Sequence, residues 1–475
     1  MAITVIAIDL NHSILQYSLS PLDGDFSAIV NPGGSYKSVL DDPIGKEAIL
    51  NGVHYPATNR FTAHFSTYLY FNYIPKFLQL WYAPIDSIYA SITVIKTLMH
   101  IGFLVVIALY AQLLLGGKKF FWIFGATLLS PLLIAHGEFG MIAFLDASIT
   151  YAMFYTLPLL VILYFYLPVL RLFLKKEKTE FSIIVLLTLT FIQFFLVLFG
   201  PLGAPVVFLI SCCFLFSLIL NSIIKNSSFS FKKVTSQILL NTPKTVIFLA
   251  FTGVVFSLYS IFLGSFNSEN DWCQLSLQQR FSALPKGIQE TFFDFSKGGA
   301  WLTFLVLFNG VSLLIFDKEW RYKTGFFLGV LLLFIVIYCV LVPFGGCRSY
   351  RPNMLRSDVS LPMISFMLVF IIYSTLRIFI LSKSWLGFVY FIGYVSISAV
   401  FFDKDILPEY TNKQEKEALL FIQNESKKGN TQIVVPIQCP IIAWGKIEIF
   451  QHSRLNANFL LKMNVVNRNI RYKNQ

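Results

Sequence analysis

The polar stretch at residues 18–42 holds the side chains best suited to chemistry in a chain that is otherwise apolar. It reads SLSPLDGDFSAIVNPGGSYKSVLDD and gathers the carboxylates of Asp23, Asp25, Asp41 and Asp42 among Gly- and Pro-rich turns. A carboxylate can take a proton from a hydroxyl group, and carboxylate oxygens can hold Mg²⁺ or Mn²⁺. We therefore predict that Asp23 and Asp25 are catalytic bases, and we leave open whether they also bind a metal ion.

A second stretch, residues 343–360, brings three arginines together. It reads PFGGCRSYRPNMLRSDVS and contains Arg348, Arg351 and Arg356. Because a guanidinium group binds phosphate through two parallel hydrogen bonds, this stretch is a candidate site for a phosphate or diphosphate. The alternative is that the arginines pair with Asp358, with the N-terminal aspartates or with lipid headgroups.

Five further ionisable side chains are candidates for substrate binding. In the segment HGEFGMIAFLDASITY, His136, Glu138 and Asp146 lie where helices end or begin, and Asp146 suits capping of the following helix. Glu138, beside two glycines, has no such structural explanation. Lys96 and His100 are four residues apart in an apolar run and so share one helix face. Such groups at membrane depth usually face a water-filled cavity, although a lysine can also extend to the interface.

The composition identifies the setting of these residues as a membrane. The chain has 475 residues, of which 56% are hydrophobic and 13% charged, with 50 Phe and a mean hydropathy of +0.67. A net charge of +12 would suggest a nucleic-acid partner for a soluble protein. Here the basic residues form short clusters between apolar runs, which is typical of cytoplasmic loops and of contact with anionic lipids. We expect membrane lipids as partners and no nucleic acid.

Apolar runs long enough for helices occur ten times along the chain. They are residues 88–115, 120–135, 147–174, 181–199, 206–220, 246–263, 300–316, 326–342, 361–380 and 385–402. Residues 1–10 are either the tail of a first spanning helix or an ordinary surface element. Alternation of period two is absent, so only helices are expected to span. The sequence predicts an all-α polytopic membrane protein with about 10–11 transmembrane helices, and Ser87 is the predicted N-cap of the first convincing one.

The charges predict the orientation, because basic residues concentrate in cytoplasmic loops. Every second loop carries a basic cluster, which places residues 11–87, the turn at 200–205, the loops at 136–146, 264–299 and 343–360, and the tail on the opposite, outer side. Three cysteines, Cys273, Cys347 and Cys439, then lie outside, where a disulfide is permitted but no pairing can be deduced.

Three regions follow from this layout. Residues 1–87 form an outer acidic segment with an aromatic interfacial helix at 61–81, broken near Pro75. Residues 88–402 form the helical bundle, whose loop at 264–299 contains a semi-apolar segment suited to the membrane surface near a lipid substrate. Residues 403–475 form a small outer α/β appendage, with the helix KQEKEALLFIQNESKKGN and the buried strand TQIVVPIQ.

This order of parts resembles the polytopic glycosyltransferases of the GT-C superfamily. The segment FLDASITYAMFYTLP is also similar to a Gly/Ala-Ser-x-x-Tyr…Pro pattern in uncharacterised bacterial membrane proteins grouped with them. The resemblance implies an enzyme of the bacterial cytoplasmic membrane that uses a polyprenyl-phosphate-linked sugar at the outer face and an acidic residue of the first outer loop as its base. The acceptor would be a glycan, a lipid or a protein.

The residues allow the chemistry to be stated without the family. Inverting transfer needs a carboxylate for the acceptor proton, here Asp23 or Asp25, and cations for the departing phosphate, here Arg348, Arg351 and Arg356. No motif for a nucleotide appears. A lipid-linked polysaccharide polymerase or O-antigen-type ligase is an alternative that would need the arginines more than the aspartates. A transporter is the second alternative, although it would show internal repeats, which are not apparent.

Overall fold

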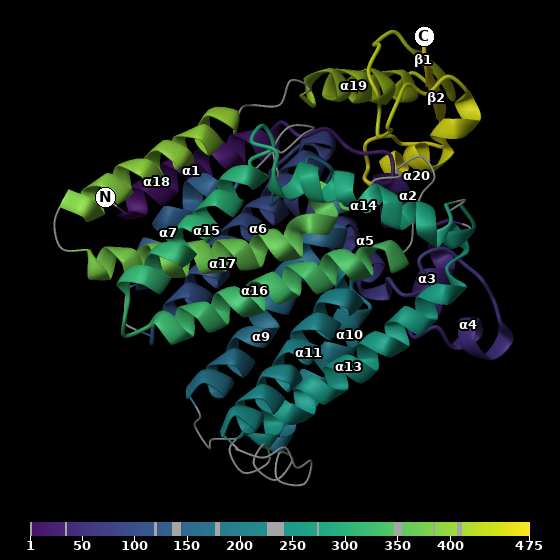
Figure 1. Cartoon of the computed structure of the whole chain (residues 1–475). Helices are drawn as coiled ribbons and strands as arrows, with labels where there is room; N and C mark the ends of the chain where they lie inside the picture. The colour runs from purple at the N-terminus through teal and green to yellow at the C-terminus, as the bar shows by residue number, and fades with distance from the viewer. Residues whose placement is uncertain are drawn as a thin grey trace.

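The structure of the chain is a computed structural model, and its description covers most of the sequence. It describes residues 2–33, 36–117, 121–134, 144–175, 181–225, 242–272, 275–345, 354–382, 385–405 and 411–475. Figure 1 shows a helical bundle with a small unit of helices and strands at one end.

Eight helices in these ranges are long and apolar enough to cross a membrane. They are α6 (Pro84–Leu114), the continuous run of α8 (Ile149–Tyr151), η3 (Ala152–Thr156) and α9 (Leu157–Lys175), α11 (Gly200–Lys225), α13 (Lys244–Leu263), α15 (Gly299–Phe316), α16 (Arg321–Leu341), α17 (Ser357–Leu381) and α18 (Trp385–Lys404). Two shorter apolar helices are α7 (Phe121–Leu129), continued by η2 (Ser130–Leu132), and α10 (Ile183–Val197). These ten segments correspond to the ten predicted apolar runs, so the predicted all-α polytopic class is confirmed and the chain is a multi-pass integral membrane protein. The predicted number of about 10–11 spans is too high for the described residues, because two of the ten apolar helices are too short to cross a membrane.

The first helix belongs to the bundle. It is α1 (Ala2–Ser18), which extends eight residues past the apolar start of the chain and packs against α6 and α7. Its buried polar side chains bond across the interface, since the hydroxyl of Ser130 donates to Asp9 over 2.5 Å and that of Tyr17 bonds to His100 Nδ1 over 2.8 Å. The acidic stretch begins where α1 ends.

Two predicted details are wrong. The helix α5 (Phe61–Leu78), predicted to be interfacial, continues through Pro75 without a break, and it packs against α6, which offsets the hydrogen bond that proline cannot donate. The helix α6 begins at Pro84 and not after Ser87, because the fixed φ of proline suits the first helical position. The side chains of Phe65, Tyr73 and Phe77 are exposed along one face of α5, as an interfacial helix requires.

The tight outer turn predicted at residues 200–205 is also wrong, because α11 already begins at Gly200. Gly200 has a φ of +72°, and a Cβ there would collide with the carbonyl oxygen of Phe154 in η3. Glycine therefore allows α11 to start directly against the π-helical turn.

The segments predicted to lie outside do gather at one end of the bundle. Thr62 donates its amide to the carbonyl of Leu198 over 3.0 Å, and Asn412 donates to that of Leu19 over 2.8 Å. In the same way Arg280, on the outer helix α14 (Leu277–Phe292), bonds to the carbonyl of Gly345 over 3.2 Å. At the opposite end Arg377 bonds to Asp317 over 2.6 Å, which joins two of the predicted cytoplasmic loops.

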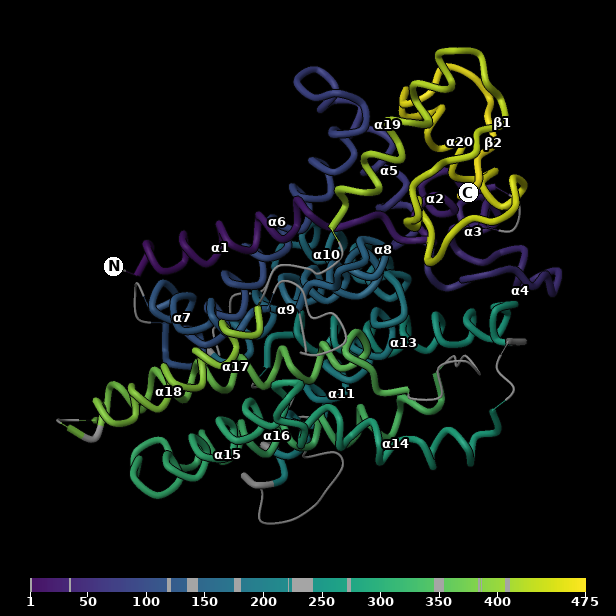
Figure 2. Tube along the Cα trace, turned by 90° about the horizontal axis from the view of Figure 1, so that it is seen from above, coloured from purple at the N-terminus to yellow at the C-terminus, as the bar shows by residue number. Residues whose placement is uncertain are grey.

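The end of the bundle that is predicted to lie outside, called the outer end below, carries short helices and the C-terminal unit. The short helices are α2 (Phe26–Val30), α3 (Lys37–Asp41) and α4 (Lys46–Asn51). The unit comprises α19 (Lys413–Lys427), β1 (Gln432–Val435), η7 (Phe450–Ser453), α20 (Arg454–Lys462) and β2 (Arg471–Asn474), with β1 and β2 parallel. Figures 1 and 2 both place it beside α2, against which α20 packs. The predicted α/β appendage is confirmed.

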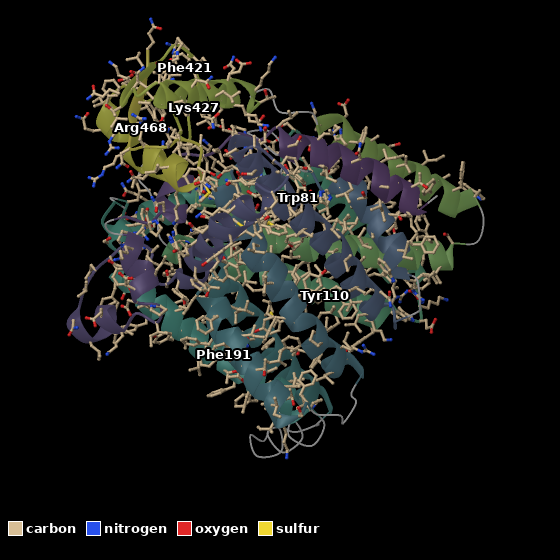
Figure 3. The ribbon with its side chains drawn as sticks, turned by 180° about the vertical axis from the view of Figure 1, so that it is seen from behind. Trp81, Tyr110, Phe191, Phe421, Lys427 and Arg468 are labelled. Carbon is tan, nitrogen blue, oxygen red and sulfur yellow. The ribbon has the colours of Figure 1, made fainter. Side chains whose placement is uncertain are left out.

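The exposed side chains follow the same division. Figure 3 shows Lys427 and Arg468 on the surface of the C-terminal unit and Phe191 on the surface of α10 in the bundle. Phe191 is 66% exposed, as are many apolar side chains of the bundle, so this surface is suited to lipid.

Candidate functional site

The buried carboxylate of Asp23 joins the acidic segment to the start of the span that begins at Ile149. Its Oδ2 accepts hydrogen bonds from the Ser148 hydroxyl at 2.7 Å and the Thr150 amide at 2.9 Å. Its Oδ1 accepts bonds from the Thr150 hydroxyl at 2.8 Å and the Asp25 amide at 3.1 Å. A carboxylate has about four acceptor positions, and these four bonds engage them all. The geometry therefore favours a structural role for Asp23.

The other carboxylates of the stretch have different surroundings. The side chain of Asp25 is exposed beside α2. Asp42 caps α4, since its carboxylate accepts the amides of Lys46 at 2.6 Å and Glu47 at 3.0 Å. Asp41 is exposed at the end of α3. Only Asp25 among these combines exposure with a position next to Asp23.

Asp146 lines a small pocket at the outer end, between the span that begins at Ile149 and α17. This outer pocket is lined by Asp146, Tyr151, Tyr155, Thr156, Ser357, Asp358 and Leu361. The Asp146 carboxylate accepts the amide of Ser148 at 2.8 Å, so Ser148 and not Asp146 occupies the N-cap position. Burial, with a smaller contribution from the nearby carboxylate of Asp358, raises the pKa of Asp146 from 3.8 to about 7. A carboxyl group that titrates near neutral pH can act as a general base or acid.

Arg356 lies at the edge of the outer pocket. Its guanidinium donates to Asp358 at 2.7 Å and to the hydroxyl of Tyr155 at 3.4 Å, so the predicted alternative of a pair with Asp358 holds for this arginine. Arg60 lies within electrostatic range of the same Tyr155 hydroxyl and pairs with Glu269 at 3.6 Å. Two guanidinium groups therefore approach Tyr155 from different segments.

Lys96 and His100 are enclosed by protein beneath this site. The ammonium of Lys96 donates to the carbonyl of Ala147 at 2.6 Å and to the hydroxyl of Ser20 at 3.4 Å. It therefore ties α6 both to the loop of Asp146 and to the acidic segment. His100 is 1% exposed and bonds to Tyr17 of α1. Lys96 and His100 therefore connect α6 to the neighbouring segments by buried hydrogen bonds.

Several predicted candidates lie outside the described residues. They are His136, Glu138, Arg348, Arg351, Cys273 and Cys347. Of the three cysteines predicted to lie outside, Cys439 is described, and it is free and buried.

The carboxylates of Asp23 and Asp25 do not fit a shared metal site. Both oxygens of Asp23 already accept two protein donors each, and these donors would have to leave before a cation could bind. Within the described residues, no group of three or more His, Cys, Asp or Glu side chains could hold a metal ion. We derive no step of the chemistry through a metal.

Comparisons of the sequence with protein-family models and with curated proteins, and of the structure with solved structures, find no match. The chemistry of the site must therefore be argued from its own residues.

A buried carboxylate of the C-terminal unit connects this unit to other segments at the outer end. Glu415 is buried, and its carboxylate accepts the amide of Leu22 at 2.9 Å, the hydroxyl of Tyr89 at 2.8 Å and the amide of Ile442 at 2.8 Å. Burial raises the pKa of Glu415 to about 7, although these bonds favour its charged form. One side chain thus joins the acidic segment, α6 and the loop at residues 439–447.

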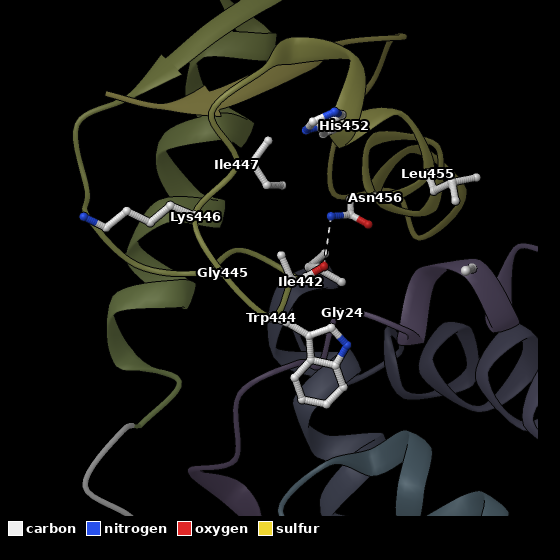
Figure 4. Close-up of a pocket in the computed structure, with 11 residues that line it drawn as sticks. Gly24, Ile442, Trp444, Gly445, Lys446, Ile447, His452, Leu455 and Asn456 are labelled. Atoms are coloured by element: carbon white, nitrogen blue, oxygen red, sulfur yellow. Dashed lines mark hydrogen bonds between the residues drawn. The ribbon is translucent and has the colours of Figure 1, made fainter. Parts of the chain in front are cut away.

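That loop places Trp444 against Tyr151, which lines the outer pocket. The Trp444 ring stacks on Tyr151, with ring centres 5.9 Å apart and planes 29° apart. The other side of the loop approaches Gly24, where a Cβ would lie 2.7 Å from the Trp444 amide nitrogen (Figure 4). Gly24 is therefore required for the close contact between the two segments.

The residues that sequence reasoning missed share one property, which is that their partners are distant in the chain. Tyr151 and Tyr155 are four residues apart at the start of a span, and this spacing could have marked a polar face. Arg60 and Trp444 are single residues in apolar or mixed segments. Nothing in their local sequence distinguishes them from ordinary interfacial side chains.

Proposed function

We propose that the chain is a membrane glycosyltransferase of the GT-C type. It uses a polyprenyl-phosphate-linked sugar at the outer face of the bacterial cytoplasmic membrane and transfers the sugar with inversion to a glycan, lipid or protein acceptor. The observation that carries this proposal is Asp146, a carboxyl group with a pKa near neutral in a pocket that also holds the Asp358 partner of Arg356.

Asp146 replaces Asp23 as the base in this proposal. The Asp146 carboxylate takes the proton of the acceptor hydroxyl, whose oxygen bonds to the anomeric carbon of the sugar. The bond from that carbon to the phosphate oxygen breaks, and the polyprenyl phosphate leaves with the electron pair. A base with a pKa close to the working pH is suited to this step. Asp23 supports it indirectly, because it fixes the loop of Asp146 through Ser148.

The arginines have the second role. Arg356, oriented by Asp358, lies where it can stabilise the negative charge that develops on the departing phosphate. Arg60 provides a second positive charge within electrostatic range of Tyr155. The membrane supplies the donor, since the outer pocket lies at the outer ends of the spans where a lipid phosphate group resides.

An assay with the full chain in lipid nanodiscs tests the proposal. Polyprenyl-phosphate hexoses are supplied with an extract of cell-envelope glycans, and the release of polyprenyl phosphate is measured. Asp146→Asn should lower the rate about 10²- to 10⁴-fold, the usual contribution of a general base. The matched control is Asp86→Asn, which alters an exposed carboxylate at the same end and should leave the rate unchanged. Equal rates for wild type and Asp146→Asn would refute the proposal.

The two guanidinium groups near Tyr155 support one alternative function, that of a polysaccharide polymerase or O-antigen-type ligase. Two cations suit two phosphates, as in the diphosphate-linked donor of a polysaccharide polymerase or O-antigen-type ligase. The same assay separates the two enzymes. Release of polyprenyl diphosphate from a diphosphate-linked oligosaccharide, with no reaction of the monophosphate-linked sugar, would establish the alternative.

A further inference from the structure

A cleft on the outer face lies between the acidic segment and the C-terminal unit. Its volume is about 260 Å³, and it is lined by Gly24 and Ala28 on one side and by residues 442–447, His452, Leu455 and Asn456 on the other (Figure 4). This volume is slightly below the roughly 300–1,000 Å³ of pockets for drug-sized molecules. The cleft therefore suits one small unit of a larger ligand.

The loop that forms the cleft is held rigidly. Ile442 is buried and has a φ of 51°, which is a strained conformation for a β-branched residue. Its amide donates to Glu415 at 2.8 Å, and its carbonyl accepts the side-chain amide of Asn456 at 2.9 Å. These bonds fix the backbone that carries Trp444, so the position of the indole is defined before any ligand binds.

Trp444 lines the cleft and contacts Tyr151, a residue of the outer pocket. Its indole is 57% exposed, which is unusual for a side chain in a rigid loop, and it stacks on Tyr151. Tyr151 in turn lines the outer pocket beside Asp146. A ligand in the cleft therefore lies next to the position where an acceptor hydroxyl would meet the base.

The polar groups of the cleft indicate the chemistry of its ligand. An exposed aromatic ring accepts the apolar C–H face of a sugar ring, while nearby polar groups bind the hydroxyls. His452 is exposed on the cleft and adds a basic group, whereas the ammonium of Lys446 donates to Gln438 at 2.6 Å and points away from the other lining residues (Figure 4). Residues 411–475 contain ten Lys and Arg and four Glu, so the unit has a net charge of 10 − 4 = +6. This charge favours an anionic ligand.

We infer that the cleft between Gly24 and the loop of Trp444 binds a saccharide unit of the acceptor, and that His452 and the net positive charge of the C-terminal unit favour a saccharide bearing an acidic group. The inference rests on the proposed function in one respect, which is that the bound saccharide belongs to the acceptor of the transfer reaction. Binding of a saccharide to the cleft does not require the transfer reaction.

Calorimetric titration of the full chain in nanodiscs tests this inference. The probes are maltotriose, which is neutral, and trigalacturonate, which has the same length and three carboxylates. We expect trigalacturonate to bind with a Kd on the order of 1 mM or below and maltotriose to bind more weakly. Trp444→Ala should weaken binding at least about 10-fold, Trp444→Phe should weaken it less because an aromatic ring remains, and His452→Gln should reduce the preference for the acidic probe.

Two controls keep the result decisive. Trp81→Ala removes another exposed tryptophan and should leave binding unchanged. Asp146→Asn should retain binding while it loses transfer, so a failed transfer reaction and a failed binding site are distinguishable. Binding of neither trisaccharide, or equal binding by wild type, Trp444→Ala and Trp444→Phe, would overturn the inference. Equal affinity for both probes in wild type and in His452→Gln would overturn the role of the basic side chain.

Discussion

Thr150 holds the Asp23 carboxylate by two hydrogen bonds, one from its amide at 2.9 Å to Oδ2 and one from its hydroxyl at 2.8 Å to Oδ1. The acidic segment that follows α1 is thereby fixed to the first turn of the span at Ile149–Leu174. The most conspicuous carboxylate of the sequence thus serves as an anchor for the pocket of Asp146.

Asp23→Asn should lower stability and should reduce transfer per folded molecule much less than Asp146→Asn does, because Asp23 positions the base and is not the base itself. The amide can accept on one oxygen only, so at least one buried donor of Thr150 or Ser148 loses its partner, at a cost of about 2–4 kcal/mol. The loss is measured by denaturant titration of the purified protein. Asp25→Asn, with an exposed side chain, is the control. If Asp23→Asn abolished transfer per folded molecule without a loss of stability, Asp23 would be the base after all.

Arg356→Lys and Arg356→Gln should separate charge from geometry in the outer pocket. Lysine keeps the charge but cannot form the paired hydrogen bonds of a guanidinium, so we expect a fall in kcat/KM of about 10-fold. Glutamine removes the charge as well, and a fall of about 100- to 1,000-fold is expected. Arg468→Gln, on the surface of the C-terminal unit, is the matched control and should have no effect. Wild-type kinetics in Arg356→Gln would exclude this arginine from the phosphate site.

Glu415→Gln should loosen the C-terminal unit. Three donors converge on the Glu415 carboxylate, and the amide of glutamine would oppose one of them with another donor, which costs about 2–3 kcal/mol. Hydrogen exchange of residues 411–475 should accelerate, with the exposed Glu417→Gln as control. Unchanged exchange in Glu415→Gln would show that other contacts hold the unit in place.

Labelling from outside the cell should confirm the orientation that the charges predict. In a variant without native cysteines, Glu417→Cys places a thiol on the outer C-terminal unit, and Tyr322→Cys places one on an 81%-exposed position at the opposite end. An impermeant maleimide should label position 417 in intact cells and position 322 only after permeabilisation. The reverse pattern would invert the topology and place the outer pocket in the cytoplasm.

Much of the fold was predictable because a membrane span depends on the hydrophobicity of one continuous run of residues. The ten apolar runs, the amphipathic α19 and the strand β1 each follow from local hydrophobicity and periodicity. The wrong details concern proline and glycine, whose effects depend on neighbours. Pro75 is tolerated because α6 packs against its helix, and Gly200 starts α11 because Phe154 lies against it.

The site was less predictable because it is assembled from distant segments. The sequence identified Asp23, Asp146 and Arg356 as candidates, but not that Asp23 would accept three hydrogen bonds from the loop and helix that follow Asp146. Local sequence treats each carboxylate alike, whereas the number of donors around each one distinguishes an anchor from a titrating group. Trp444 reaches Tyr151 only through the fold of the C-terminal unit.

The pH dependence of transfer is the most direct test of Asp146 as the base. Its pKa in the folded chain is raised from 3.8 to about 7, so the carboxylate forms as the pH rises through 7 and is protonated below that. We predict that kcat for transfer from a polyprenyl-phosphate hexose rises with pH through an apparent pKa near 7 in wild type. The residual rate of Asp146→Asn should lack this rise. The same rise in both proteins, or a wild-type rate that is constant from pH 5 to 9 (a range of about two units either side of that pKa), would contradict the account.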